Sequence, residues 1–195
     1  MSLENLKAAE DKLAQIVKRY PNKRSALMPA LYLGQEAVGY VSAEVISWVA
    51  TKIGVSSAEV KEVATFYTMY QQKPVGKYHL QVCRTLSCHL AGAKPLVNFL
   101  KEKLAVDAHQ VTADGLFSYE EVECLGSCGT GPVVQINDVY FERMDSEKLA
   151  SLLERIKTEL PDLRYSTLKD ELGVGLADMP RSQLVNLKEG KHGAS

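Results

Sequence analysis

Two cysteine segments decide the fold of this chain: VCRTLSC at residues 82–88 and ECLGSCG at residues 123–129. They hold all four cysteines of the 195-residue sequence. Four residues lie between the cysteines of the first pair and three between those of the second, and the stretch between the two segments is long enough for a helix and a strand. Two distant loops would converge on one object, and thiolates are strong ligands for zinc and iron, so the pattern predicts a metal centre.

The spacing within each pair favours one kind of centre without deciding it. Structural zinc sites most often use short spacings, because a tight knuckle wraps a single small ion. A [2Fe–2S] cluster is a larger object that takes two thiolates on each iron, and the wider loops of this chain fit it better. Gly126, Gly129 and Gly131 would let the backbone come close and aim N–H groups at the negative charge of a cluster. A zinc site, and disulfides or unligated thiols, stay open as alternatives.

Further motifs around the cysteines resemble one known family. They are VATFY at 63–67, PVGKY at 74–78 leading to Val82-Cys83, and ECLGSC at 123–128 running through Gly131-Pro132 to VQIND at 134–138. From about residue 27 to about residue 160, the chain resembles the NuoE-type thioredoxin-like [2Fe–2S] ferredoxin subunit of NADH:quinone oxidoreductase, respiratory complex I. Many relatives have Asn-Ala where this chain has Thr130-Gly131, and an arginine near position 91 where it has Ala91.

The resemblance implies a function for these residues. Its four motif cysteines correspond to Cys83, Cys88, Cys124 and Cys128, which would be the ligands of one [2Fe–2S] cluster. The expected partner is a NuoF-type flavoprotein subunit that carries FMN and the NADH site, within the larger peripheral arm of complex I. Arg84 lies between two of these ligands and is expected near the cluster, whereas His89, directly after Cys88, is expected to be a neighbour rather than a ligand.

Some functions are excluded by what the sequence lacks. Gly173-x-Gly175 has no third glycine in place and follows no expected strand, and no P-loop occurs, so the chain should not bind NADH or flavin by itself. It is therefore expected not to be a catalyst alone. The alternatives are the equivalent diaphorase subunit of an NAD-linked hydrogenase or formate dehydrogenase and, from a different class, a four-cysteine zinc interaction module.

Charge and hydropathy limit the partners and the cellular location that the chain could have. With 23 basic and 24 acidic residues the net charge is −1, which gives no field suited to nucleic acid. No apolar stretch approaches membrane-spanning length, so no direct membrane insertion is expected. The start of the chain has neither a secretion-signal nor a transit-peptide character. We expect the protein in the cytoplasm, attached to the inner face of the bacterial cytoplasmic membrane only through its complex. Thiols stay reduced in the cytoplasm, so the cysteines would be available as ligands.

The periodicity predicts helices over 1–72, mixed strands and helices over 73–163 and a tail at 164–195, in a fold of the α+β or α/β class. The resemblance implies that the first two segments are an N-terminal helical bundle and a thioredoxin-like ferredoxin domain. Helices are expected over the first twenty residues, from about Ser25, after the N-cap Ser42, and after the capping box Ser56-x-x-Glu59. Phe66, Tyr67 and Tyr70 are expected to pack in the core of this bundle. Beyond a linker at 71–76, the expected order is β-α-β-β-β-α. The last helix is expected after the N-cap Asp145.

Overall fold

The computed structural model describes residues 3–163, which divide between Pro74 and Val75 into two compact units. Each unit has a hydrophobic core of its own. The core residues of the first unit lie between Leu6 and Tyr70, and those of the second lie between Tyr78 and Leu163. Burial of apolar surface is the dominant favourable term in folding, and each unit buries apolar surface in a core of its own.

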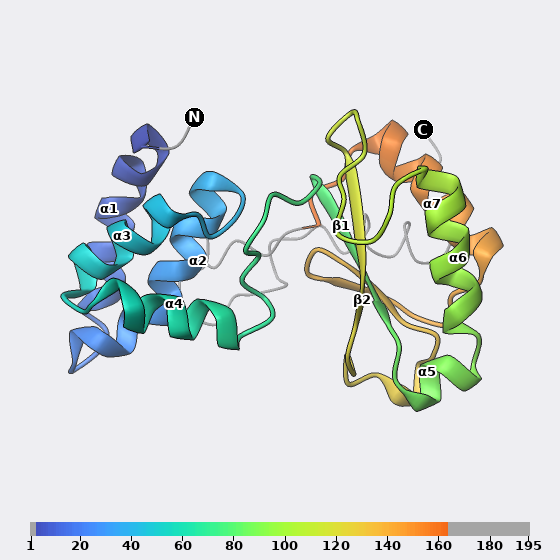
Figure 1. Cartoon of the computed structure of the whole chain (residues 1–195), viewed down its shortest axis with the longest axis horizontal. Coiled ribbons are helices and arrows are strands. Elements are labelled where there is room, and N and C mark those ends of the chain that lie inside the picture. The colour runs from blue at the N-terminus through green and yellow to red at the C-terminus, as the bar shows by residue number, and fades with distance from the viewer. Residues whose placement is uncertain (1–2, 164–195) are drawn as a thin grey trace, which may run out of the picture. The chain divides into compact units, whose positions relative to one another are not determined.

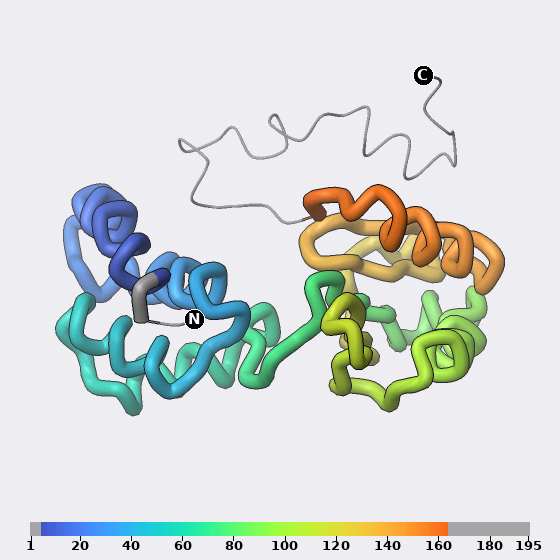
Figure 2. Tube along the Cα trace, turned by 90° about the horizontal axis from the view of Figure 1, so that it is seen from above, coloured from blue at the N-terminus to red at the C-terminus, as the bar shows by residue number. Residues whose placement is uncertain are grey.

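The first unit is helical (Figures 1 and 2). Its elements are α1 (Leu3–Val17), the 3₁₀ turn η1 (Lys23–Ala26), α2 (Leu27–Val38), α3 (Ala43–Ile53) and α4 (Ser57–Phe66). The helices expected from the sequence are confirmed, with one difference. The stretch from Ser25 is not a single α-helix, because the Asn22 side chain accepts a hydrogen bond from the Arg24 N–H and starts a 3₁₀ turn first.

Local capping explains why these helix boundaries could be predicted. The Ser42 hydroxyl accepts a hydrogen bond from the Val45 N–H at 3.3 Å. Ser56 and Glu59 form the expected reciprocal capping box, with both hydrogen bonds present. Each bond satisfies an N–H group that the first turn of a helix leaves without an intrahelical partner. Short-range sequence signals therefore fix where α3 and α4 begin.

The aromatic group after α4 does not pack as a whole, which corrects the expectation from the sequence. Tyr70 is buried, and its hydroxyl donates to the Met28 carbonyl oxygen at 3.0 Å. Phe66 is 78% exposed and Tyr67 is 37% exposed, and the two rings contact each other edge to face. α4 ends at Phe66, so the buried stripe of the helix does not extend to these two side chains.

The second unit contains a four-stranded sheet and three helices among the described residues. Its elements are β1 (Tyr78–Cys83), α5 (Leu86–Leu90), α6 (Ala93–Leu104), β2 (Phe117–Val122), the 3₁₀ turn η2 (Cys128–Thr130), β3 (Val134–Ile136), β4 (Val139–Phe141) and α7 (Ser146–Glu159). The expected β-α-β-β-β-α order is confirmed, with α5 as an additional short helix. α6 and α7 lie along one side of the sheet, where their leucines join its core (Figure 1).

Strand pairing brings the two cysteine segments together. The sheet order is β2-β1-β3-β4, in which β1 and β2 are parallel and the other two pairs are antiparallel. Cys83 is the last residue of β1 and pairs with Val122, the last residue of β2. Parallel strands end at the same edge of a sheet, so Cys124, two residues after β2, follows at the edge where Cys83 lies.

Polar side chains of β1 and β2 form a closed network away from the cysteines. The His79 ring is hydrogen-bonded through Nδ1 to Ser118 Oγ at 2.8 Å and through Nε2 to Glu120 Oε1 at 3.0 Å. Gln81 donates to the same Glu120 oxygen at 2.8 Å. Although burial alone would raise it, the hydrogen bonds from His79 and Gln81 hold the pKa of Glu120 below its ordinary value. His79 is thus a satisfied sheet residue.

The tail expected at 164–195 lies outside the described residues. Within residues 3–163, none of the helices has both the length and the apolar character needed to cross a bilayer.

Candidate metal centre

All four cysteines lie at the edge of the sheet where β1 and β2 end. The backbone fixes this edge, because the Cys83 N–H donates to the Val133 carbonyl at 3.1 Å and the Arg84 N–H donates to the Val122 carbonyl at 3.0 Å. α5 follows at once and carries Cys88, and it lies at the lower end of the unit in Figure 1. The structure therefore brings together the two loops that the sequence predicts to converge.

The four thiols differ in exposure. Cys83 and Cys88 are buried, at 2% and 1% exposure, and belong to the hydrophobic core of the unit. Cys124 and Cys128 are exposed, and their sulfur atoms are 3.5 Å apart. None of the four is in a disulfide. The centre would thus have one side within the protein and one side at the surface.

Backbone N–H groups point at the sulfur atoms. The Gly126 N–H donates to Cys124 Sγ at 3.4 Å, and the Thr85 hydroxyl lies 3.2 Å from Cys83 Sγ. Although burial alone would raise it, hydrogen bonds from Thr85 and from the Leu125 N–H hold the pKa of Cys83 below its usual value. The Gly126 N–H, followed by Cys128, lowers the pKa of Cys124. Such donors favour thiolates, which are the ligand form of cysteine.

For the second thiol of each pair, the pKa is raised instead of lowered. Burial, followed by the neighbouring Cys83, raises the pKa of Cys88, and the contact with Cys124 raises the pKa of Cys128. In each pair, ionisation of one sulfur therefore opposes ionisation of the other. A metal cation between the two sulfurs removes this conflict, because it lets both be thiolates at once.

The grouping of the cysteines bears on how many metal ions fit. The cysteines are neighbours in two pairs, Cys83 with Cys88 and Cys124 with Cys128. Two thiolates on each of two ions is the ligand arrangement of a [2Fe–2S] cluster, whereas a structural zinc takes all four on one ion. The residues present fit the two-iron group.

Two glycines give the second loop its shape. Gly126 has φ of 82°, a left-handed conformation that allows its N–H to reach Cys124. At Gly131 a Cβ atom would lie 3.3 Å from Cys88 Sγ, closer than most side-chain contacts. The backbone therefore passes directly beside a buried thiol, as a close cradle for a metal group requires.

Charged side chains next to the cysteines also join the two loops. Arg84 donates through Nε to Glu123 Oε1 at 3.0 Å, and its Nη2 contacts the same oxygen. Arg84 follows Cys83 and Glu123 precedes Cys124, so this ion pair joins the two cysteine segments. The sequence indicated Arg84 but not Glu123. The signal that could have found Glu123 was its charge, opposite to that of Arg84, one residue before Cys124.

Reversing the charge at Arg84 is expected to lower the reduction potential of a cluster at this site, on the order of tens of millivolts. Arg84→Glu removes a cation and places a second carboxylate beside Glu123, and reduction adds a negative charge that both changes oppose. Redox titration at low ionic strength measures the shift. Arg24→Glu, in the helical unit, is the control for charge reversal, and an Arg84→Glu potential equal to that of the control would contradict the expectation.

Comparison with known proteins gives consistent matches. The family model described as thioredoxin-like [2Fe-2S] ferredoxin matches residues 13–157. NADH-quinone oxidoreductase subunit 2 of Thermus thermophilus is 46% identical over 151 residues, which are 76% of this chain and 83% of the relative. A second NADH-quinone oxidoreductase subunit, from Rickettsia bellii, is 43% identical over 159 residues, or 80% of this chain and 93% of the relative.

A solved structure is similar as well. The crystal structure of an NAD⁺-reducing [NiFe]-hydrogenase in the air-oxidized state superposes with a TM-score of 0.61 at 26% sequence identity. The match covers 70% of this chain but only 23% of the hydrogenase chain, so the shared region is a small part of that longer protein.

Proposed function

Because the chain belongs to the thioredoxin-like [2Fe–2S] ferredoxin family, we propose that it is the [2Fe–2S] electron-transfer subunit of the NADH dehydrogenase module of an NADH:quinone oxidoreductase, respiratory complex I. The expected fold, an N-terminal helical bundle followed by a thioredoxin-like ferredoxin domain, is confirmed. The observation that carries the functional proposal is the convergence of four thiols, as two pairs, at one edge of the sheet.

The proposed ligands are Cys83, Cys88, Cys124 and Cys128. The bound cluster supplies one-electron chemistry. The chain's own groups hold and compensate it: the Gly126 and Leu125 N–H groups donate toward sulfur, and the Thr85 hydroxyl lies beside Cys83. Burial of Cys83 and Cys88 keeps water from one side, while the exposed Cys124 and Cys128 leave a side open for electrons to enter and leave.

A partner must supply the two-electron chemistry. NADH delivers a hydride, which carries two electrons, so a flavin has to divide the pair before single electrons reach a [2Fe–2S] cluster. The proposed partner is the NuoF-type flavoprotein subunit with FMN and NADH, in the peripheral arm of the complex. The location proposed for the chain is the cytoplasm, at the inner face of the bacterial membrane through this complex.

The likeness to the NAD⁺-reducing hydrogenase favours one second candidate, the equivalent diaphorase subunit of such an enzyme. The site would do the same chemistry in either complex. Purification of the tagged chain from its native cells, followed by identification of the copurifying subunits, separates the two. Quinone-reductase subunits support the first candidate, and a nickel–iron hydrogenase subunit supports the second.

Metal and sulfide content tests the proposal most directly. Purified under anaerobic conditions after expression with adequate iron, the chain is expected to be reddish-brown, with two irons and two acid-labile sulfides per chain. One-electron reduction should give an unpaired-electron signal in paramagnetic resonance. One zinc per chain without labile sulfide would instead establish the four-cysteine zinc module.

A further inference from the structure

The strand after the second cysteine segment holds that segment through two side chains. The Tyr140 hydroxyl, on β4, donates to the Leu125 carbonyl oxygen at 2.9 Å. Glu142, directly after β4, accepts a hydrogen bond from the Thr130 hydroxyl at 2.7 Å through Oε1, and the Ser127 hydroxyl donates to the same oxygen. These contacts join residues 12 to 15 positions apart in the sequence.

The contacts enclose the loop of the exposed cysteines. Leu125 lies directly after Cys124, and Ser127 directly before Cys128, so Tyr140 holds one half of the loop and Glu142 the other. The hydroxyl oxygens of Ser127 and Thr130 also lie 2.6 Å apart. Because both contact the same Glu142 oxygen, the three side chains form a compact network. Backbone bonds continue the attachment, because the Arg143 N–H donates to the Thr130 carbonyl at 2.8 Å.

This loop depends on such contacts more than the first loop does. Cys83 and Cys88 are anchored in the hydrophobic core, at 2% and 1% exposure, whereas Cys124 and Cys128 are exposed. Apolar packing therefore holds both thiols of the first pair directly, whereas in the second loop it is Leu125, between the two thiols, that packs against the core. Hydrogen bonds from a neighbouring strand of the sheet can hold the second pair, in the way that outer-shell partners orient metal ligands in other proteins.

We infer that Tyr140 and Glu142 are positioning residues that brace the Cys124–Cys128 loop around the cluster, and that the Glu142 carboxylate also keeps the reduction potential low. This inference rests on the proposed function. The two residues act differently, because Tyr140 contributes a neutral hydrogen bond, whereas Glu142 contributes acceptor oxygen atoms and a negative charge. Reduction adds negative charge to the cluster, so a nearby carboxylate disfavours it.

Three variants of the holoprotein separate these roles. Tyr140→Phe removes the bond to Leu125 without changing charge. Losing an outer-shell partner typically costs about tenfold or more in metal affinity, so a chelator should bleach the cluster of this variant faster by a similar factor. Glu142→Gln keeps an acceptor oxygen for both hydroxyls but removes the charge, so the midpoint potential should rise while bleaching changes less. Glu142→Ala removes both functions and should show both effects.

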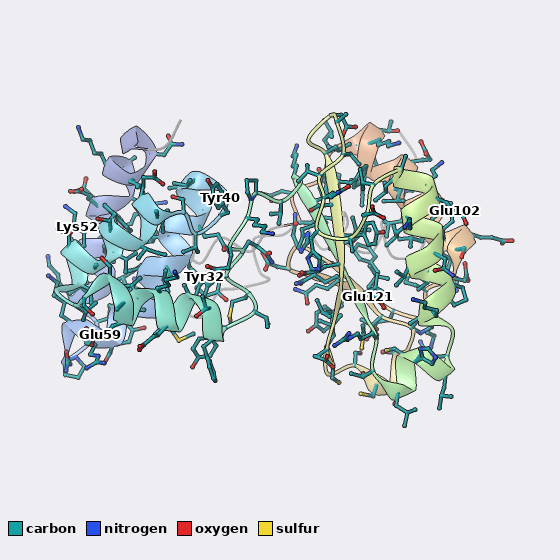
Figure 3. The ribbon with its side chains drawn as sticks, viewed as in Figure 1. Tyr32, Tyr40, Lys52, Glu59, Glu102 and Glu121 are labelled. Atoms are coloured by element: carbon teal, nitrogen blue, oxygen red, sulfur yellow. The ribbon has the colours of Figure 1, made fainter. Side chains whose placement is uncertain are left out.

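Glu102→Gln provides the matched control. It makes the same charge change at an exposed site near the far end of α6, away from α5 and the cysteines (Figure 3). Its potential and its bleaching rate should equal those of the wild type. The potential is measured by redox titration at low and high salt, because screening should shrink the shift of Glu142→Gln. Circular dichroism of each variant verifies the fold.

Each of the two proposed roles can be overturned by one result. Wild-type bleaching rates for both Tyr140→Phe and Glu142→Ala would overturn the bracing role. A potential of Glu142→Gln equal to that of Glu102→Gln would overturn the electrostatic role. If Glu142→Ala does not fold, Tyr140→Phe and Glu142→Gln still test the two roles separately. Failure of the proposed function looks different, because the wild type itself would then contain no iron–sulfur cluster.

Discussion

Replacing Cys88 with alanine is expected to abolish binding of the cluster. Each iron of a [2Fe–2S] cluster takes two ligands from the protein, and the sequence has no cysteine beyond the four proposed ones that could take the place of Cys88. Cys88 is buried at 1% exposure beside Cys83, so water or an exogenous thiol has no ready route to the vacant position. The protein should be colourless, with little iron or labile sulfide and no spectral change on reduction.

The neighbouring residue provides the control. Ser87 lies on the same short helix and is exposed, so Ser87→Ala should keep the wild-type cluster content and visible absorption. Thermal unfolding of the helical unit should be the same in both variants, because among residues 3–163 its core contains none beyond Tyr70. A Cys88→Ala protein with two irons and two sulfides would show that the ligand assignment is wrong. A zinc site would also lose metal, but the wild type would then contain zinc.

Local sequence signals were sufficient for most of the element boundaries. The caps Ser42, Ser56 and Asp145 each accept a hydrogen bond from an N–H in the first turn of their own helix, so three or four residues contain the whole interaction. Predictions of this kind succeed because the determining contact and the determining residues lie next to each other in the chain.

Contacts between distant residues explain what the sequence did not reveal. α5 spans only five residues, fewer than periodicity can identify, and it was not predicted. The exposure of Phe66 depends on where the buried stripe of α4 ends, which the aromatic pattern does not specify. Tyr140 and Glu142 reach the cysteine loop only because β4 returns beside it, so nothing in their local sequence distinguishes them from ordinary strand residues.

Deletion of residues 1–74 is expected to separate cluster binding from partner binding. The four proposed ligands and the whole core of the second unit lie beyond this boundary. Gly76 belongs with that core, because its N–H donates to the buried Ser118 hydroxyl at 2.8 Å and a Cβ at this position would lie 2.4 Å from the Phe117 backbone. The cut therefore falls before Val75, two residues after the boundary expected from the sequence.

The shortened chain should be coloured and reducible by dithionite, with the cluster content of the full-length protein. It should no longer copurify with the flavoprotein partner, and NADH should no longer reduce its cluster through that partner. The physical reason is that the ligand geometry requires no residue of the helical unit, which leaves docking as the role proposed for its separate core. Copurification and NADH-dependent bleaching of the visible absorption measure the two losses.

A fragment of residues 1–74 provides the complementary control, since a docking unit should compete with the full-length chain for the flavoprotein. The opposing account makes the helices part of what stabilises the sheet, and it predicts that a chain of residues 75–195 is insoluble or colourless. A third result would reject the docking role itself: a shortened chain that keeps its cluster, binds the flavoprotein and accepts electrons from NADH at the full-length rate. Within the described part of the chain the two cores share no residue, so we expect the first result, with the cluster intact and the partner lost.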